Sequence, residues 1–397
     1  MPTLAIATSI VKKLKAAGHT AYFAGGWVRD LSLQKPSDDI DIATSASVSE
    51  VQALFPKTIP VGVAFGIVIV VEGDHKFEVA TFRKDRGYTD GRRPTGIERA
   101  SPEEDATRRD FTINGMFFDP IENKILDYVK GQEDINKKII RAIGDPHERF
   151  LEDRLRMMRA IRYSTRFDFP IEKNTQEAII AQAHTLLPAV AMERVWQEFK
   201  KMSQFAHFDT GLITLQKLGL LSTIFPDLKN IEITPLVKPI PDFPKDAPPI
   251  SELLQLFPNY TSPQIESLCD YLKLSKEEKT FALFLQAAKK ITTLEKIAWA
   301  KFYASPYSEI TLKIIAANLP KEERAPFLHE HLLRRQSLEK PILRIQSNTP
   351  LITSDDLLKA GIPPGKQMGL LLKEAERLSV NENLEDKALI LKKILDS

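Results

Sequence analysis

Residues 21–44 read AYFAGGWVRDLSLQKPSDDIDIAT, and this stretch decides the fold of the N-terminal part of the chain. A short run of aromatic and small apolar residues, Ala21–Ala24, ends in the adjacent glycines Gly25 and Gly26, and an acidic run then leads into a second apolar stretch. These signals predict a strand, a glycine turn, a helical stretch and another strand. Two glycines directly after a strand let backbone amides approach a phosphate closely, because no Cβ atom intrudes.

The alternation of strands and turns continues to about residue 128. Short β-branched or aromatic runs predict further strands at Ile40–Thr44, Ile67–Val71, Phe77–Phe82 and Ile125–Tyr128. Residues 1–17 have the spacing of a short amphipathic helix, and from residue 149 apolar residues recur every three or four positions almost to the end of the chain. We therefore predict an α/β head with a mixed sheet and helices, followed by an all-helical remainder.

The length of 397 residues exceeds what one hydrophobic core usually serves, so more than one domain is expected. Seven prolines between Phe225 and Ile250 are too many for a helix or a central strand, and they predict an extended connector between helical parts. The expected division is a head over residues 1–140, a helical neck over 141–205, a helical body over 206–300 and a helical tail over 301–397.

The composition excludes several classes of protein. The formal net charge is only +2, so a basic surface for nucleic acid would have to be local. The one cysteine, Cys269, excludes an intramolecular disulfide and a multi-cysteine zinc site, and it predicts a buried thiol in a reducing, cytoplasmic compartment. The sequence has no signal-peptide pattern and no apolar run of about 18 residues, so no membrane association is expected.

Paired carboxylates follow the glycine turn. Asp39 and Asp41 lie two apart in a β-like run, so both side chains are expected on one face, and Glu78 lies on a later predicted strand. Oxygen ligands suit Mg²⁺, and a two-ion site would activate a hydroxyl and steady a leaving pyrophosphate. Arg29 would add a charged clamp on a triphosphate. The alternatives are an ordinary turn and a solvated strand end.

Residues 104–114 read EDATRRDFTIN. With the glycine turn and the paired aspartates, this motif makes the chain resemble the class II tRNA nucleotidyltransferases and bacterial poly(A) polymerases, which share a polymerase-β-like head. The resemblance implies that Arg109 and Asp110 position the nucleotide and that Asn114 lies near its sugar. It also implies ATP and CTP as substrates and tRNA as the partner. The alternative for the arginines is a set of surface ion pairs.

Residues 149–162 read RFLEDRLRMMRAIR and have helical spacing. Asp153, Arg156 and Arg159 would share one face of that helix at intervals of three. An Asp–Arg pair could select cytosine and adenine, because both offer an amine beside an acceptor nitrogen, whereas uracil and guanine offer a carbonyl beside an N–H. The resemblance implies that Arg159 and Arg162 hold the triphosphate or brace this helix. An intrahelical salt bridge is the alternative.

Two further segments bear on the choice within the family. The polar segment Arg83–Pro94 is similar to the flexible loop that relatives use when they add the terminal A, although an ordinary surface loop would look the same. Residues 360–372 end one helix and begin another, and they are similar to the tail of bacterial tRNA nucleotidyltransferases, where Lys366 would meet the RNA backbone. A plain helix–turn–helix remains the alternative there.

The chain departs from the family pattern at Gly115, where Ala is usual, and at Gln34, where Gly is common. The sequence lacks the clustered His-Asp pairs of a phosphohydrolase. The family resemblance implies template-independent addition of C and/or A to tRNA 3′ ends by two-metal nucleotidyl transfer. An A-adding enzyme with a separate CC-adding partner, a poly(A) polymerase and a catalytically inactive RNA-binding protein remain alternatives.

Overall fold

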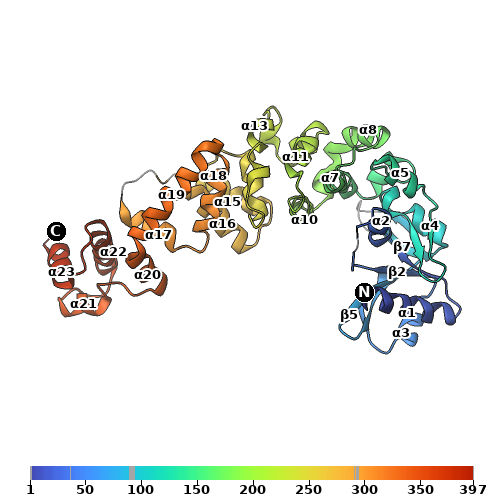
Figure 1. The fold of residues 1–397 in the computed structure, drawn as a ribbon, viewed down its shortest axis with the longest axis horizontal. Coiled ribbons are helices and arrows are strands. Elements are labelled where there is room, and N and C mark those ends of the chain that lie inside the picture. Colours follow the sequence, from blue (N-terminus) through green and yellow to red (C-terminus); the bar gives the residue numbers. More distant parts are fainter. Residues whose placement is uncertain (1, 36, 89–93, 290, 292–294, 397) are drawn as a thin grey trace. The chain divides into compact units, whose positions relative to one another are not determined.

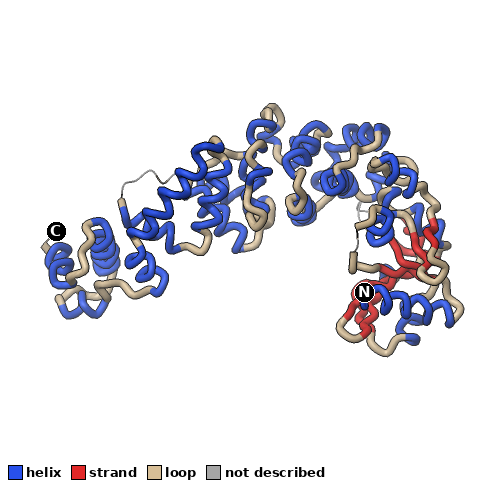
Figure 2. Tube along the Cα trace, in the orientation of Figure 1, coloured by secondary structure: helices blue, strands red, loops and turns tan. Residues whose placement is uncertain are grey.

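Figure 1 shows a computed structural model of the chain, which describes residues 2–35, 37–88, 94–289, 291 and 295–396. The chain divides into two units, Met1–Pro235 and Leu236–Ser397. All of the strands described lie in the first unit, and the second unit is built from helices (Figure 2). The prediction of an α/β head followed by helices is confirmed, whereas the finer division into head, neck, body and tail stays a prediction.

The head is built on a seven-stranded mixed sheet with the order β3-β4-β5-β2-β1-β8-β9. Only the β2–β5 pair is parallel among the pairs described. A separate two-stranded ribbon is formed by β6 and β7. The strands are β1 Ala21–Ala24, β2 Asp41–Thr44, β3 Thr58–Gly62, β4 Ile67–Glu72, β5 His75–Thr81, β6 Arg83–Tyr88, β7 Pro94–Arg99, β8 Phe117–Asp119 and β9 Lys124–Leu126.

The register of this sheet separates a buried face from a face with carboxylates. Phe23, Ile42, Val79 and Val68 are neighbours on successive strands and are at most 1% exposed. Because side chains alternate across a strand, the next row points to the opposite face. That row contains Asp41 of β2 and Glu78 of β5, since the pairing of Ile42 with Val79 puts the preceding residues side by side.

Helices α1 (Pro2–Ala16) and α3 (Val48–Leu54) pack against the sheet. Helix α1 buries residues at intervals of three and four, which is the stripe of an amphipathic helix, and these are Ala7, Ile10, Val11 and Leu14. At one edge of the sheet lies β3, where the register shifts between Ile59 and Gly62. The edge strand exposes Ile59 and Val61, and Val63 follows it.

The sequence patterns missed four strands of the head, β3, β6, β7 and β8. β3 and β8 were not predicted, because β3 contains a proline and has no buried face and β8 has only three residues. The segment Arg83–Pro94 was predicted as a loop, but it contributes β6 and the first residue of β7, a ribbon with no alternation of apolar residues. The tip, residues 89–93, lies outside the described residues.

The predicted helix over residues 149–162 is broken in the structure. Helix α6 (Pro146–Glu152) ends before Asp153, which has an extended backbone (φ −143°, ψ 102°), and α7 (Leu155–Phe167) begins two residues later. The Asp153 carboxylate accepts the N–H of Leu155 at 3.1 Å. The prediction that Asp153 shares one helix with Arg156 is therefore wrong, because an aspartate whose carboxylate accepts a backbone N–H two residues later favours a turn over continuation of the helix.

Further helices complete the first unit and lead into the proline-rich segment. They are α2 Gly26–Ser32, α4 Pro102–Thr107, α5 Gly131–Lys137, α8 Lys173–Gln182, α9 Leu186–Ala189, α10 Met192–Met202, α11 Phe208–Lys217, α12 Leu220–Ile224 and α13 Thr234–Val237. The segment 225–250 is not the extended connector expected from its prolines. It forms short helical turns that bury Leu228, Val237 and Ile240, and it carries prolines at first-turn positions, where no N–H is needed.

The second unit contains α14 Pro249–Leu253, α15 Ser262–Tyr271, α16 Lys276–Ala288, α17 Lys296–Ala304, α18 Ser308–Ala317, α19 Lys321–Ser337, α20 Glu339–Ser347, α21 Ser354–Lys359, α22 Lys366–Asn381 and α23 Lys387–Leu395. Two apolar clusters hold it together, one around Tyr303 and Ile342 and one around Leu357 and Ile390. Cys269 is fully buried as predicted. Among the described residues no helix is long and apolar enough to span a bilayer.

Candidate active site

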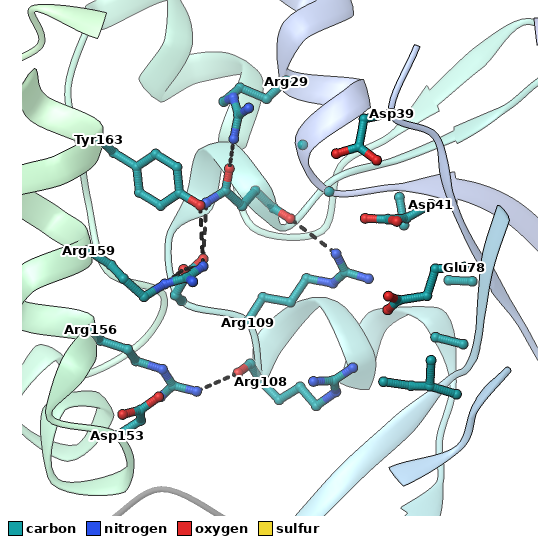
Figure 3. Close-up of a pocket in the computed structure, with 18 of the residues that line it drawn as sticks. Arg29, Asp39, Asp41, Glu78, Arg108, Arg109, Asp153, Arg156, Arg159 and Tyr163 are labelled. Carbon is teal, nitrogen blue, oxygen red and sulfur yellow. Dashed lines mark hydrogen bonds and ion pairs between the residues drawn. The ribbon is translucent and has the colours of Figure 1, made fainter. Parts of the chain in front are cut away.

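One cavity of about 530 Å³ in the first unit collects most of the predicted site residues (Figure 3). Its size is in the range of ligand sites, which is roughly 300–1,000 Å³. The walls come from the turn after β1, the ends of β2 and β5, residues 108–114 and helix α7. Twelve predicted residues line it: Gly25, Gly26, Arg29, Asp39, Asp41, Glu78, Arg109, Asp110, Asn114, Asp153, Arg156 and Arg159.

The turn after β1 requires glycine at its first position. Gly25 has φ 64° and ψ −120°, a conformation that residues with a Cβ rarely adopt. A Cβ at Gly25 would also meet Nη1 of Arg109 at 3.0 Å. The absence of a side chain at Gly25 therefore lets the Arg109 guanidinium lie against the backbone at the start of helix α2.

Three carboxylates form the acidic side of the cavity. Asp39 lies just before β2, Asp41 begins β2, and Glu78 lies on β5 beside it (Figure 3). Burial, followed by the charges of Glu78 and Asp39, raises the pKa of Asp41 to about 7, whereas Arg109 opposes this rise. Crowded negative charges of this kind are relieved by a bound cation.

The donor set suits a hard divalent ion. Magnesium is commonly bound by one or two carboxylates together with phosphate oxygens and water. Among the described residues, no three His, Cys, Asp or Glu side chains stand close enough together to hold an ion by themselves. Asp39 and Asp41 therefore fit a magnesium site that also takes oxygen ligands from a bound substrate.

A buried network lies under the centre of the cavity. Nε of Arg159 donates to Asp110 at 2.8 Å, and Asn114 donates to the same carboxylate at 3.1 Å. Burial raises the pKa of Asp110, but the charge of Arg159 and these hydrogen bonds outweigh it and hold the pKa at about 2. Arg29 donates to Oδ1 of Asn114 at 2.5 Å and stacks over Tyr163. Asp110 thus orients Arg159 and Asn114 instead of pointing freely into the cavity.

Asp153 and Arg156 lie together at one end of the cavity (Figure 3). Nη1 of Arg156 donates to Glu152 at 2.6 Å and to the carbonyl of Arg149 at 3.0 Å, and Nη2 donates to the carbonyl of Arg108 at 3.1 Å. A guanidinium carries five N–H groups. Among the described contacts, the second Nη2 hydrogen and the Nε hydrogen remain available to a nucleobase. Arg194 holds the Asp153 carboxylate from α10 at 3.4 Å.

Arg162 and Lys366 do not line this cavity. Arg162 is buried and donates to Glu198 at 2.5 Å, so the expectation that it holds a triphosphate is wrong, whereas its role as a brace agrees with this contact. The contact with Glu198 of α10 explains the difference, because this buried ion pair turns the Arg162 guanidinium away from the cavity. Lys366 belongs to the second unit, at the start of α22.

The sequence analysis assigned no role in this site to five residues that line the cavity with polar side chains: Arg83, Arg108, Tyr163, Arg166 and Arg194. Arg156, Arg159, Tyr163 and Arg166 follow one another on α7 at spacings of three, four and three, so the helical period contained the signal for two of the five. Arg166 also donates to Asp30 at 3.1 Å, which ties α7 to α2. The sequence carried no comparable signal for Arg194, which approaches from α10.

Three family models match the chain. They describe the poly A polymerase head domain over residues 21–141, the probable RNA- and SrmB-binding site of polymerase A over residues 168–232, and tRNA nucleotidyltransferase domain 2 over residues 250–395. The chain is 33% identical to a CCA-adding enzyme of Pediococcus pentosaceus, in an alignment that covers 97% of this chain and 96% of that protein.

Other relatives align over a shorter region. The chain is 48% identical to a CCA-adding enzyme of Anoxybacillus flavithermus over 197 residues, so that match spans about half of each protein, 49% of this chain and 49% of the relative. Among solved structures, the Bacillus stearothermophilus CCA-adding enzyme in complex with CTP superposes with a TM-score of 0.77 at 29% identity and covers 100% of this chain and 98% of its own. The Thermotoga maritima CCA-adding enzyme complexed with tRNA, at 21% identity and a TM-score of 0.65, over 98% of this chain and 94% of its own, shares the fold.

Proposed function

Because this chain belongs to the CCA-adding enzyme family of tRNA nucleotidyltransferases, we propose that it adds C and A from CTP and ATP to the 3′ end of tRNA without a nucleic-acid template. In each addition the terminal 3′-hydroxyl oxygen bonds to the α-phosphorus of the nucleotide. The bond from that phosphorus to the bridging oxygen breaks, pyrophosphate leaves, and the hydroxyl proton passes to solvent.

One observation carries this proposal: a single cavity has carboxylates at one side, arginines along its floor and an Asp–Arg pair at one end. A nucleoside triphosphate has the complementary order, with metal-binding phosphates, a sugar and a base. Arginine forks match phosphate oxygens in geometry and charge. The cavity is therefore suited to bind one nucleotide in one orientation.

Different residues of the chain bind different parts of the nucleotide and its metal ions. The amides at the Gly25–Gly26 turn and the guanidinium of Arg109 receive the triphosphate, with Arg159 further along the floor. Asn114, whose side chain is hydrogen-bonded to Asp110 and to Arg29, faces the sugar. Asp39 and Asp41 would hold Mg²⁺, and Glu78 would add negative charge beside them. Two such ions, when bound, supply activation of the hydroxyl and neutralisation of charge on the phosphates.

Base selection rests on Asp153 and Arg156. Asp153 accepts from the exocyclic amine of cytosine or adenine, while Arg156 donates to the adjacent ring nitrogen. Uracil and guanine would set a carbonyl against the carboxylate and an N–H against the guanidinium. The clamp of Glu152 on Arg156 reduces the freedom of the arginine, so the pair is preorganised for the correct bases.

The second unit is proposed to hold the RNA. Lys366 lies at the first position of α22, after Gly365, where free helical amides and a positive charge meet phosphate favourably. We propose the cytoplasm as the place of action, since the substrate is tRNA and the only thiol is buried.

A nucleotide-addition assay tests the function and separates its alternatives. The purified protein is incubated with Mg²⁺, with each nucleotide separately, and with tRNA that lacks either the whole CCA end or only its last A. Incorporation of two C and one A is expected. Failure to use CTP on the shorter tRNA would favour the A-adding alternative, long A-tails on arbitrary RNA would favour a poly(A) polymerase, and unchanged incorporation by Asp41→Ala would contradict the site.

A further inference from the structure

Asp105 is a buried carboxylate that the binding scheme above does not use. It lies in α4, is 1% exposed and does not line the cavity. Its Oδ1 accepts the backbone N–H of Arg83 at 3.2 Å and Nη2 of Arg108 at 2.6 Å. Its Oδ2 accepts Nε and Nη2 of Arg109 at 3.2 and 3.0 Å.

The contact of Asp105 with Arg109 affects the acidic side of the cavity. Asp105 holds two nitrogens of that guanidinium, the Phe117 ring lies 4.9 Å from it, and the third nitrogen lies against Gly25 and the carbonyl of Asn114. A long arginine side chain has many rotamers, and two charge-assisted hydrogen bonds to one carboxylate oxygen restrict them strongly. Asp105 therefore determines where the charge of Arg109 stands relative to Asp41.

The contact of Asp105 with Arg108 affects the β6–β7 ribbon and the end of the cavity that carries Asp153 and Arg156. Nε of Arg108 donates both to Asp105 at 2.9 Å and to the carbonyl of Arg83, the first residue of β6, at 3.0 Å. The carbonyl of Arg108 accepts Nη2 of Arg156 at 3.1 Å. The base of the β6–β7 ribbon, the phosphate-binding arginine and the base-selecting arginine thus all connect to residues 105–108.

We propose that Asp105 is a positioning residue for nucleotidyl transfer, which aligns Arg109 with the triphosphate and ties the base of the β6–β7 ribbon to Arg156. This inference rests on the proposed function. The charges of Arg109 and Arg108 hold the pKa of Asp105 below its usual value although burial opposes them, so the carboxylate is ionised when it holds them.

The test is Asp105→Asn in the full chain. An asparagine has the same shape but turns an NH₂ group toward one of the two guanidinium forks, so one fork loses its acceptor. We expect the KM for CTP and ATP to rise about tenfold, the scale of one lost hydrogen bond to a charged group, and the rejection of UTP to weaken. The KM for tRNA should change little.

The matched control is Asp119→Asn. Asp119 is also buried, at 3%, belongs to the same head and pairs with Lys15, but it lies outside the cavity. This variant is expected to lower thermal stability while KM for nucleotides and UTP rejection stay at the wild-type values. Equal kinetic parameters in the two variants would overturn the proposal, because the loss would then be structural.

A double-mutant cycle with Arg109→Lys tests whether Asp105 acts through Arg109. Lysine keeps the charge but cannot form the fork with Asp105, and Arg109 is exposed enough at 19% of its side chain for the variant to fold. If Asp105 acts through Arg109, the effect of Asp105→Asn on nucleotide KM should disappear in the Arg109→Lys background. Strictly additive effects would contradict the proposal.

If Asp105→Asn is too unstable to assay, a second variant tests the proposal. Arg108→Gln removes the fork that joins Asp105 to Arg83, and it is expected to weaken UTP rejection more than it raises nucleotide KM. Unchanged UTP rejection in that variant would contradict the tie to Arg156. If instead the wild-type protein adds no nucleotide to tRNA, the proposed function itself fails, which is a different outcome from any of these.

Discussion

Gly25 and Arg109 lie so close together that a methyl group on the glycine would meet Nη1 of the arginine at 3.0 Å. The two residues are far apart in the sequence, and their approach brings the turn after β1 to the motif that ends at Asn114. The chemistry of the site therefore depends on a position that has no side chain.

Gly25→Ala should abolish most nucleotide addition. The added Cβ strains the backbone by about 1–3 kcal/mol in this sparsely populated conformation, and it also displaces Arg109. We expect kcat/KM for CTP and ATP to fall by roughly 10- to 100-fold, the scale of lost hydrogen bonds to a charged group. Gly18→Ala is the control, since Gly18 has φ 86° but no atom within 4 Å of the added Cβ. A comparable loss of activity in the control would mean that strain alone is responsible.

Gly115→Ala should destabilise the head, although relatives usually carry alanine at this position. A Cβ there would meet Cγ2 of Val129 at 2.6 Å and Cδ1 of Ile143 at 2.9 Å. Overpacking of this kind costs about 1–3 kcal/mol. Chemical denaturation of Gly115→Ala, Val129→Ala and the double variant should show that the double variant loses less than the sum of the singles. Full stability of Gly115→Ala would refute this account of the departure.

Glu252→Gln should stabilise the second unit in a pH-dependent manner. Burial raises the pKa of Glu252 to about 8, and its Oε2 has no hydrogen-bond partner among the described residues. Between the unfolded pKa, 4.5, and about 8 the folded form keeps the proton that the unfolded form loses, so stability falls as pH rises through this window.

The measurement for Glu252 is a series of thermal melts between pH 4.5 and 8.5. The glutamine variant should gain over the wild type as pH rises, reach its largest gain near pH 8, and show little difference near pH 4.5. Glu322→Gln, at an exposed position of α19, controls for the loss of a charge. A difference that does not vary with pH would be inconsistent with a protonated buried carboxyl group.

Asp153→Ala and Arg156→Ala should loosen base selection more than they weaken RNA binding. A bidentate base contact discriminates by about 1–3 kcal/mol, which corresponds to roughly 5- to 150-fold in rate. Misincorporation of UTP, measured in competition with CTP, should rise by that order, while tRNA binding measured by filter retention stays near the wild-type value. Unchanged UTP rejection in both variants would remove the Asp–Arg pair from the selection of bases.

Much of the site could be predicted from the sequence, because its residues occur in short motifs with local geometry. A glycine pair after a strand and two carboxylates at alternate positions carry their spatial meaning within a few residues. Arg156 and Arg159 likewise follow from helical spacing. Tyr163 and Arg166 were accessible to the same argument, whereas the ion pair that takes Arg162 out of the cavity, with Glu198 of α10, was not.

Other features depend on contacts that no local pattern records. The break at Asp153 is accompanied by a hydrogen bond from the N–H of Leu155 to the Asp153 carboxylate, which helical spacing alone does not reveal. The strand β6 has no apolar alternation, and its base is held by Asp105 across more than 20 residues. Several prolines of residues 225–250, such as Pro226 and Pro249, occupy first-turn positions of short helices, so their number gave a misleading indication of an extended chain.

The irregular edge strand β3 has a consequence for self-association. An exposed edge strand with the apolar side chains Ile59 and Val61, followed directly by Val63, would ordinarily recruit the edge of a second molecule and begin an aggregate. Pro60 offers no N–H to such a neighbour, and the shifted register around it interrupts the flat template that cross-β stacking needs. The head can thus expose an apolar edge strand to water and still resist polymerising into fibrils.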